Sequence, residues 1–175
     1  ILDAEPGAQI VFGHQAQTKE ELEELIENDD WDNLLAKRFV KPGDFFYVQA
    51  GLVHAIGAGV TLLEVQQSSD TTYRFYDYDR TDADGNKREL HLEDALNVTI
   101  VPAVDETPTP FGIETNNGRV TLLQSNEYFA IEHWLVTGET SFDKVEDYTL
   151  IGVVKGEGSI TVDGEAYDVK QGTFL

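Results

Sequence analysis

One histidine follows two glycines at a spacing that points to metal chemistry. Gly43 and Gly51 flank a short, largely apolar stretch, and His54 stands three residues after the second glycine. Glycine allows a tight turn at each end of a strand because it has no Cβ. The next strand would then direct His54 into the mouth of a barrel, where a neutral imidazole binds zinc, iron or manganese well. The alternative is a core histidine that is hydrogen-bonded inside the barrel.

This spacing resembles the second sequence motif of the cupin superfamily, in which glycine, proline, glycine and histidine stand at fixed intervals. Both glycines and the histidine are in place, and Gln49 stands where the motif has proline. Because the spacing matches, we expect His54 to be a metal ligand rather than a core histidine.

The residues that follow His54 carry a more specific resemblance. The block from Gln66 to Arg80 reads QQSSDTTYRFYDYDR. It resembles type I mannose-6-phosphate isomerase in its short bacterial form, which belongs to the cupin superfamily. The similarity extends upstream through Phe12-Gly13-His14 and downstream through Arg88-Glu89-Leu90-His91, so it covers essentially the whole chain.

The resemblance implies one zinc ion per complete catalytic domain, held by histidine and carboxylate ligands. Only His54 corresponds to one of these ligands, and zinc normally takes three or four. The other ligands are therefore expected upstream of Ile1. The sequence also lacks methionine and stops inside an apolar pattern at Leu175. We accordingly expect the chain to be a fragment that is inactive by itself.

The resemblance further implies an aldose–ketose isomerase that interconverts mannose 6-phosphate and fructose 6-phosphate through an enediol. Zinc would act as a Lewis acid on the sugar oxygens, and a positioned base would move the proton between C1 and C2. The catalytic arginine of the family corresponds to Arg74, whose planar fork suits oxyanions. Asp70 could orient Arg74 or transfer protons, and Glu64, on the strand after His54, is a further acid–base candidate.

Each of these three residues has a simpler interpretation. Arg74 could pair with a surface carboxylate, Asp70 could cap backbone amides in its Ser-Ser-Asp-Thr turn, and Glu64 could be only an arginine partner. His14, His91 and His133 have no motif support, so we expect them to be structural or surface residues.

The densest basic cluster contains Arg80, Lys87 and Arg88. It could contact phosphate, although solvated hairpin charges are the simpler explanation for Lys87. If the substrate is a hexose 6-phosphate, a local cationic pocket is needed, and Arg74 together with Arg80 or Arg88 could form it.

The elements that must position these residues are mostly short strands. A capping box at Thr18 and Glu21 predicts a helix, and Trp31, Leu34 and Leu35 give a second helix its buried face. A short helix is predicted within residues 91–98. Strands are predicted at residues 8–12, 45–48, 60–66, 71–78, 120–123, 128–136, 148–154, 159–162 and 166–169. The pair Asp163-Gly164 predicts a hairpin turn.

Many short strands with glycine-rich turns predict a mainly β protein, with cupin-type jelly-roll barrels (a double cupin) and a short two-helix insertion. We assign residues 1–100 to the C-terminal portion of the catalytic cupin domain. Residues 101–115, which are rich in proline, are the predicted linker. Residues 116–175 are predicted to form an incomplete second cupin-like barrel.

Composition excludes several classes of protein. Asp and Glu total 33 against 12 Lys and Arg, a net charge of −21. This charge argues against nucleic acid and against anionic membrane surfaces. There is no cysteine, hence no disulfide and no thiolate site. No signal peptide is apparent, so a cytoplasmic location is expected, and the sequence leaves the oligomeric state open.

Two rival functions belong beside the isomerase. The first is a non-catalytic, cupin-like sugar-binding or regulatory protein, which the missing upstream ligands would favour. The second is an iron-dependent cupin oxygenase, which the specific block from Gln66 to Arg80 disfavours.

Overall fold

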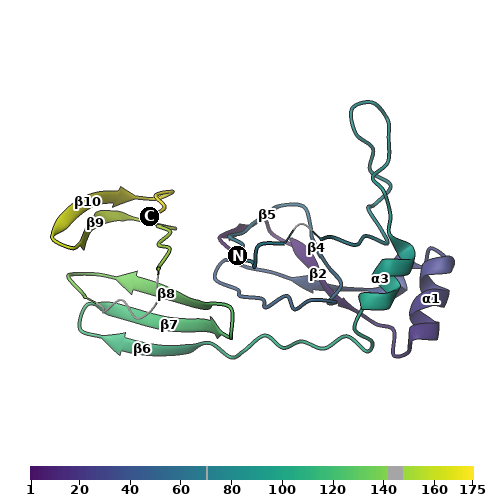
Figure 1. Ribbon diagram of the computed structural model, residues 1–175, viewed down its shortest axis with the longest axis horizontal. Coiled ribbons are helices and arrows are strands. Elements are labelled where there is room, and N and C mark those ends of the chain that lie inside the picture. The colour runs from purple at the N-terminus through teal and green to yellow at the C-terminus, as the bar shows by residue number, and fades with distance from the viewer. Residues whose placement is uncertain (70, 142–147) are drawn as a thin grey trace. The chain divides into compact units, whose positions relative to one another are not determined.

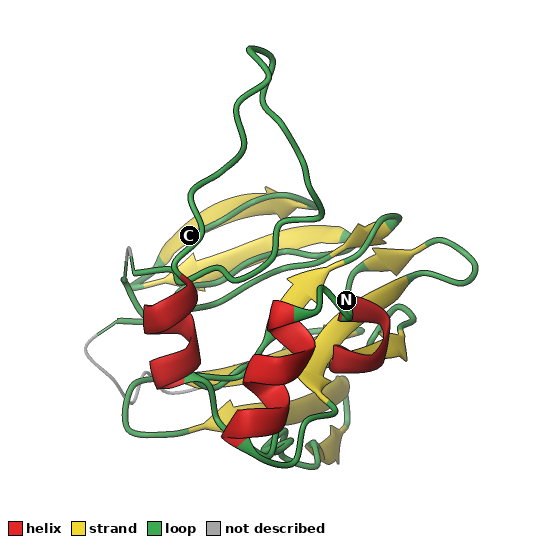
Figure 2. Cartoon of the chain, turned by 90° about the vertical axis from the view of Figure 1, so that its right-hand side faces the viewer, coloured by secondary structure: helices red, strands yellow, loops and turns green. Residues whose placement is uncertain are grey.

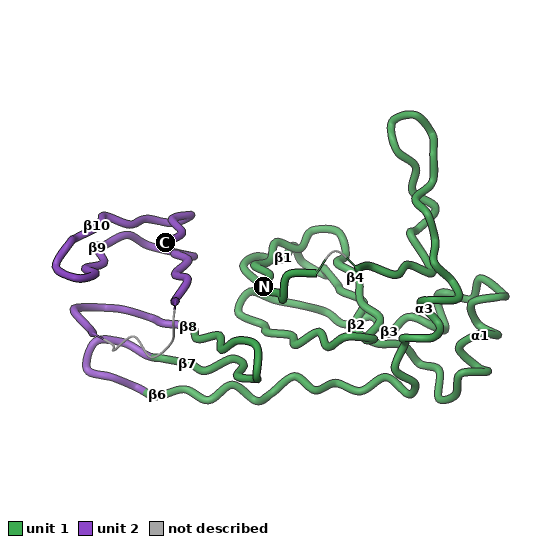
Figure 3. Tube along the Cα trace, viewed as in Figure 1, with its two compact units in different colours: residues 1–113, 120–133 green, residues 114–119, 134–175 purple. Residues whose placement is uncertain are grey.

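The structure is a computed structural model that describes residues 1–69, 71–141 and 148–175. The chain divides into two compact units, drawn in two colours in Figure 3. Unit 1 comprises residues 1–113 and 120–133, and unit 2 comprises residues 114–119 and 134–175. The domain limits predicted from the sequence stay a prediction.

A three-stranded antiparallel sheet forms the centre of unit 1 (Figure 1). Strand β2 (Gln9–His14) lies between β3 (Leu35–Phe39) and β4 (His54–Ile56). Phe12 is the partner of His54 across the β2–β4 ladder. Because directly paired residues in a ladder share a face, His54 stands on the same face of the sheet as Phe12.

Strand β2 carries apolar side chains on both sides, as is typical of a central strand. A cluster of apolar side chains covers each face of this sheet. Ile10 and Phe12 pack in one cluster with Val40 and Leu52. Val11 packs on the opposite face in a second cluster, whose other buried members come mainly from the helices and the loops beside them. These members are Ala16, Leu22, Ile26, Leu34, Leu35, Phe75 and Ala95.

Three short helices belong to unit 1 (Figure 2). They are α1 (Lys19–Glu27), α2 (Trp31–Leu34) and α3 (Leu92–Val98). The predicted N-cap is confirmed, because Thr18 Oγ1 accepts a 3.2 Å hydrogen bond from the backbone N–H of Glu21. The Glu21 carboxylate in turn accepts from the N–H of Gln17, one residue before the cap.

The remaining strands form three further small sheets. Strand β1 (Asp3–Ala4) pairs with β5 (Val60–Thr61). Strands β6 (Phe111–Thr115), β7 (Gly118–Ser125) and β8 (Ala130–Val136) form a sheet in that order, and the division between the units passes within these strands.

The predicted hairpin at Asp163-Gly164 is confirmed. It joins β9 (Glu157–Val162) to β10 (Glu165–Lys170), and Val162 pairs with Glu165. Both turn residues have positive φ, 52° for Asp163 and 86° for Gly164. This is the turn geometry that the twist of a tight hairpin favours.

Several strand predictions were wrong. Residues 45–48, 71–78 and 148–154 form no strand, and only Val60–Thr61 is a strand within 60–66. The aromatic side chains in these segments pack onto neighbouring side chains instead: Phe46 contacts Phe12, while Phe75 and Tyr76 lie against Trp31. Aromatic residues favour strands mainly because strands let them pack, and here loops provide the same burial.

The expected mainly β architecture is therefore present as several small antiparallel sheets. In the part of the chain that the structure describes, no sheet closes into a barrel. None of its helices is long and apolar enough to cross a membrane.

Candidate functional site

His54 opens strand β4, directly after the turn at Gly51. Its Nδ1 lies 2.9 Å from the carbonyl oxygen of Leu52, an oxygen that can only accept. The proton therefore belongs on Nδ1, and Nε2 keeps a free lone pair. Histidines that bind metals usually donate their other ring N–H to a carboxylate, a backbone carbonyl or a water molecule. The His54 side chain is exposed, so Nε2 is open to a ligand.

The described residues do not complete a metal site around His54. Among them, no group of three or more histidine, aspartate or glutamate side chains is placed so that it could hold a metal ion. A catalytic zinc site needs three protein ligands, so His54 fits as one ligand and the described residues supply no set of three. Zinc ligation by His54 stays a prediction.

Arg74 is half-buried in the loop that precedes α3. Its carbonyl oxygen accepts a 2.6 Å hydrogen bond from the backbone N–H of His91, the N-cap residue of α3. The His91 ring also meets the ring of Tyr73 edge-on, with 6.0 Å between the centroids. The Arg74 backbone is thus held at the start of a helix. Within the described ranges, its guanidinium has no carboxylate partner.

The two predicted carboxylates are placed differently. Glu64 is exposed, in the loop after β5, and Asp70 lies outside the described residues. Among the interactions of the described residues, no hydrogen bond or ion pair joins His54, Glu64 and Arg74. The catalytic roles predicted for Arg74, Asp70 and Glu64 stay predictions.

The basic cluster of Arg80, Lys87 and Arg88 is neutralised by nearby aspartate side chains. Arg80 Nη2 lies 2.5 Å from Asp77 Oδ1, and Arg88 Nε lies 3.7 Å from Asp77 Oδ2. Lys87 Nζ lies 2.5 Å from Asp79 Oδ1, and this hydrogen bond, with the charge of Asp79, raises the pKa of Lys87. All three cations are therefore paired with carboxylates.

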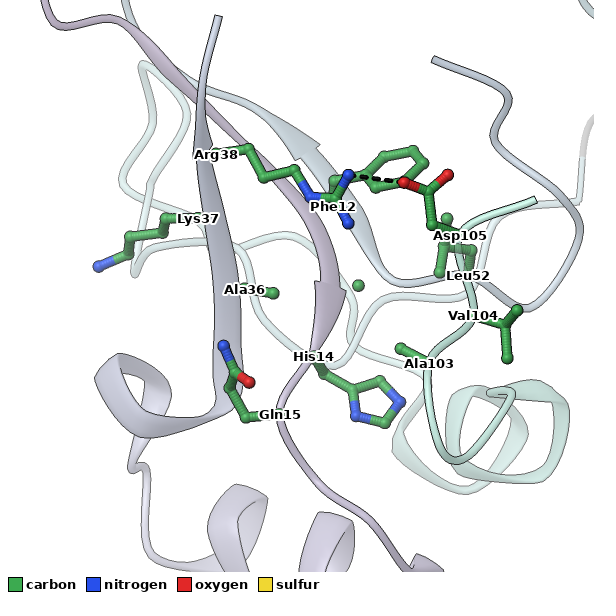
Figure 4. Close-up of a pocket in the computed structure, with 11 residues that line it drawn as sticks. Phe12, His14, Gln15, Ala36, Lys37, Arg38, Leu52, Ala103, Val104 and Asp105 are labelled. Atoms are coloured by element: carbon green, nitrogen blue, oxygen red, sulfur yellow. Dashed lines mark hydrogen bonds and ion pairs between the residues drawn. The ribbon is translucent and has the colours of Figure 1, made fainter. Parts of the chain in front are cut away.

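A second polar group lies at the end of β2 (Figure 4). His14 is buried, and its Nε2 donates to the carbonyl oxygen of Ile100 at 2.9 Å. Arg38 lies over the Phe12 ring, 4.7 Å from its centroid, and pairs with Asp105 at 2.7 Å. These residues line a cavity of about 280 Å³. The carbonyl partner and the burial of His14 match the structural role expected for it.

The sequence did not reveal the importance of the Arg38–Asp105 ion pair or of the buried Asp77. The Arg38–Asp105 pair joins residues 67 positions apart, so no local pattern reveals it. Asp77 could have been noticed, because it precedes Arg80 by three residues. Its burial, with a relative exposure of 8%, depends on tertiary packing that the local pattern does not show.

A comparison with models of protein families identifies the class of protein that part of this chain resembles. Residues 119–175 match the family model of the mannose-6-phosphate isomerase cupin domain. The cupin expectation is thereby confirmed at the level of the family for this part of the chain.

The whole chain is similar to particular members of this class. It is 45% identical over 175 residues to the mannose-6-phosphate isomerase ManA of Bacillus subtilis, covering 100% of this chain and 56% of that protein. It is 44% identical over 177 residues to the mannose-6-phosphate isomerase of Streptococcus mutans, covering 100% of this chain and 55% of that protein.

A solved structure agrees with these relatives. The crystal structure of the mannose 6-phosphate isomerase from Bacillus subtilis matches with a TM-score of 0.95 and 37% identity, covering 99% of this chain and 55% of that one. The resemblance predicted from the sequence is confirmed: the chain resembles mannose-6-phosphate isomerases along its entire length. It spans a little over half of their length.

Proposed function

We propose that this chain forms part of a mannose-6-phosphate isomerase, which interconverts mannose 6-phosphate and fructose 6-phosphate through an enediol. The observation that carries the proposal is identity of 45% to ManA over all 175 residues. The ligand in this proposal is a hexose 6-phosphate. The sheets around β2 and β7 would then belong to two cupin-type jelly-roll barrels.

His54 would supply one zinc ligand through Nε2. The 2.9 Å contact of Nδ1 with Leu52 supports this role, because it fixes the tautomer that leaves Nε2 unprotonated. When bound, zinc would supply Lewis-acid chemistry at the sugar oxygens. The described residues supply no complete set of zinc ligands.

Arg74 would stabilise negative charge on the substrate. Its guanidinium is free of ion pairs within the described residues, and the hydrogen bond from His91 fixes its backbone. A guanidinium stays charged and offers several donors to an oxyanion, whether of an enediolate or of a phosphate. Arg80 and Arg88 are weaker phosphate candidates because both are paired with Asp77.

A carboxylate would move the proton between C1 and C2. Glu64 is exposed and therefore accessible, and Asp70 precedes Arg74 by four residues. Both are acid–base candidates, since a carboxylate within hydrogen-bond reach of the substrate can act as a general base.

A chimera tests the proposal. This chain would replace the matched segment of Bacillus subtilis ManA, so that the unmatched part of ManA supplies whatever the chain lacks. We expect the chimera to convert mannose 6-phosphate in a coupled assay. A folded chimera that binds mannose 6-phosphate without turning it over would support the second candidate, a non-catalytic sugar-binding or regulatory protein.

A further inference from the structure

A second cavity in unit 1 has a buried carboxylate among its lining residues. Its volume is about 370 Å³, within the range of small-molecule sites. Asp77 lines it, and the side chain of this residue is only 9% exposed. Oδ1 of Asp77 accepts a hydrogen bond from Arg80 Nη2 at 2.5 Å. Oδ2 accepts none from any described residue.

Oδ2 of Asp77 can accept a hydrogen bond from a donor on a bound ligand. Arg88 Nε lies 3.7 Å from Oδ2, close enough for an ion pair but too far for a hydrogen bond. A buried acceptor that lacks a partner costs free energy, which a ligand that donates a hydrogen bond would recover. A carboxylate can only accept, so the ligand must carry O–H or N–H groups.

The charges around the cavity balance one another. Its lining contains equal numbers of acidic and basic side chains, namely Asp29, Asp77, Asp79, Arg80, Lys87 and Arg88. The arginines and the lysine already pair with Asp77 and Asp79. A phosphate dianion would compete with these carboxylates and has no proton to donate to Oδ2. A cation would meet the arginines that flank Asp77. The electrostatics therefore favour an uncharged donor, such as a hydroxyl group.

One wall of the cavity is aromatic. Trp31 and Tyr76 both line it, and their rings stack with 4.2 Å between centroids and 12° between planes. Apolar and aromatic walls with a few polar groups are typical of small-molecule sites. An aromatic wall beside a carboxylate suits a ligand with one apolar C–H face and several hydroxyls, which describes a pyranose ring.

We propose that the cavity lined by Asp77 and Trp31 binds a neutral hexopyranose, with a sugar hydroxyl donating to Asp77 Oδ2 and the C–H face of the ring against the aromatic wall. This inference goes beyond the proposed isomerase and does not depend on it. A protein that fails every isomerase assay could still bind a neutral sugar here.

Tryptophan fluorescence of the full 175-residue chain tests this proposal with methyl α-mannoside as the probe. The chain has two tryptophans, Trp31 in the cavity wall and Trp134 in β8, so the Trp134→Phe background reports Trp31 alone. We expect a saturable change on adding the mannoside and no such change with inorganic phosphate. Absence of saturation in this background would overturn the proposal, and so would a response to phosphate alone.

Asp77→Asn supplies the residue-level test. Loss of a hydrogen bond to a charged group should weaken mannoside binding about tenfold. Asp84→Asn, which removes the same charge from an exposed turn, should leave binding unchanged. Unweakened binding in a folded Asp77→Asn protein would contradict the assignment of the hydroxyl to Oδ2. If that variant does not fold, the mannoside and phosphate titrations of the Trp134→Phe background decide the question alone.

Discussion

The backbone N–H of Ile100 donates a 3.0 Å hydrogen bond to the carbonyl oxygen of Gly51. This bond fastens the chain just after α3 to the turn that precedes His54. Gly51 has φ of +83°, and a Cβ at this position would lie 2.4 Å from the carbonyl oxygen of Val98. The second glycine of the motif thus allows α3 to approach the strand that begins with His54.

Replacing this glycine should therefore be costly. Gly51→Ala should destabilise the protein by about 2–4 kcal/mol, through left-handed strain together with the clash against Val98. Urea denaturation followed by circular dichroism measures this loss.

Gly43→Ala is the matched control. Gly43 also has positive φ, +91°, but a Cβ there would meet nothing within 4 Å. Only the backbone strain remains in Gly43→Ala, so we expect the free energy of unfolding to fall by about 1 kcal/mol. Equal losses in the two variants would show that the approach of Val98 to Gly51 contributes nothing to stability.

The N-cap of α1 offers a second prediction. Thr18→Ala removes the oxygen that accepts from the Glu21 N–H, and this should cost about 1 kcal/mol in the free energy of unfolding. Thr18→Ser keeps an acceptor oxygen and should restore most of the loss. Thermal denaturation of the two variants makes the comparison, and a serine variant as unstable as the alanine variant would argue against the cap.

The core between β2 and the helices gives a third prediction. Leu34 has no exposed surface, and Leu34→Ala should cost about 2–5 kcal/mol because it removes buried contacts and leaves a cavity. Leu63→Ala, at a residue that is 44% exposed, should change stability by less than about 0.5 kcal/mol. Denaturant titrations of both variants would measure these values, and similar losses would contradict the packing described for α2.

The Arg38–Asp105 pair makes stability depend on pH at the acid end. Burial raises the pKa of Asp105, but hydrogen bonds from Arg38 and Thr107 outweigh it, so the pKa lies below its ordinary value. A depressed carboxyl pKa stabilises the fold above the unfolded-state pKa, and that stability is lost as the pH falls through the folded pKa. Because both side chains are well exposed, the contribution should be at most about 1 kcal/mol.

Asp105→Asn isolates this contribution. The variant should be slightly less stable than the parent at neutral pH. The difference should shrink as the pH falls below the ordinary aspartate range, near pH 4. Urea midpoints measured at several pH values test this, and a difference that stays constant down to strongly acidic pH would assign the effect to packing instead.

The helices and tight turns of this fold were the parts most accessible from sequence. The cap at Thr18 and the hairpin at Asp163-Gly164 are set by local hydrogen bonding and φ preferences, and both were predicted correctly. The segment 71–78 was predicted as a strand because its aromatic pattern suits one. Its rings pack against Trp31 from α2, about forty residues earlier in the chain, and a local pattern does not contain that contact.

The candidate site was accessible only through family resemblance. The glycine spacing located His54, and the structure adds the contact of Nδ1 with Leu52 that leaves Nε2 available. Asp77 went unnoticed because its significance lies in burial and in its pairing with Arg80 and Arg88. Local sequence shows the charge of a residue but not the solvent exposure that determines its energetic role.

Steady-state kinetics and zinc content of the chimera with Bacillus subtilis ManA test the central claim most directly. The chimera should turn over mannose 6-phosphate and hold about one zinc ion, the number that the family resemblance implies. Within it, His54→Ala should lose zinc and turnover together, whereas Arg74→Ala should keep zinc and lose about a hundredfold or more in kcat. Full activity of the folded, zinc-loaded Arg74→Ala chimera, or unchanged zinc content after His54→Ala, would contradict the account.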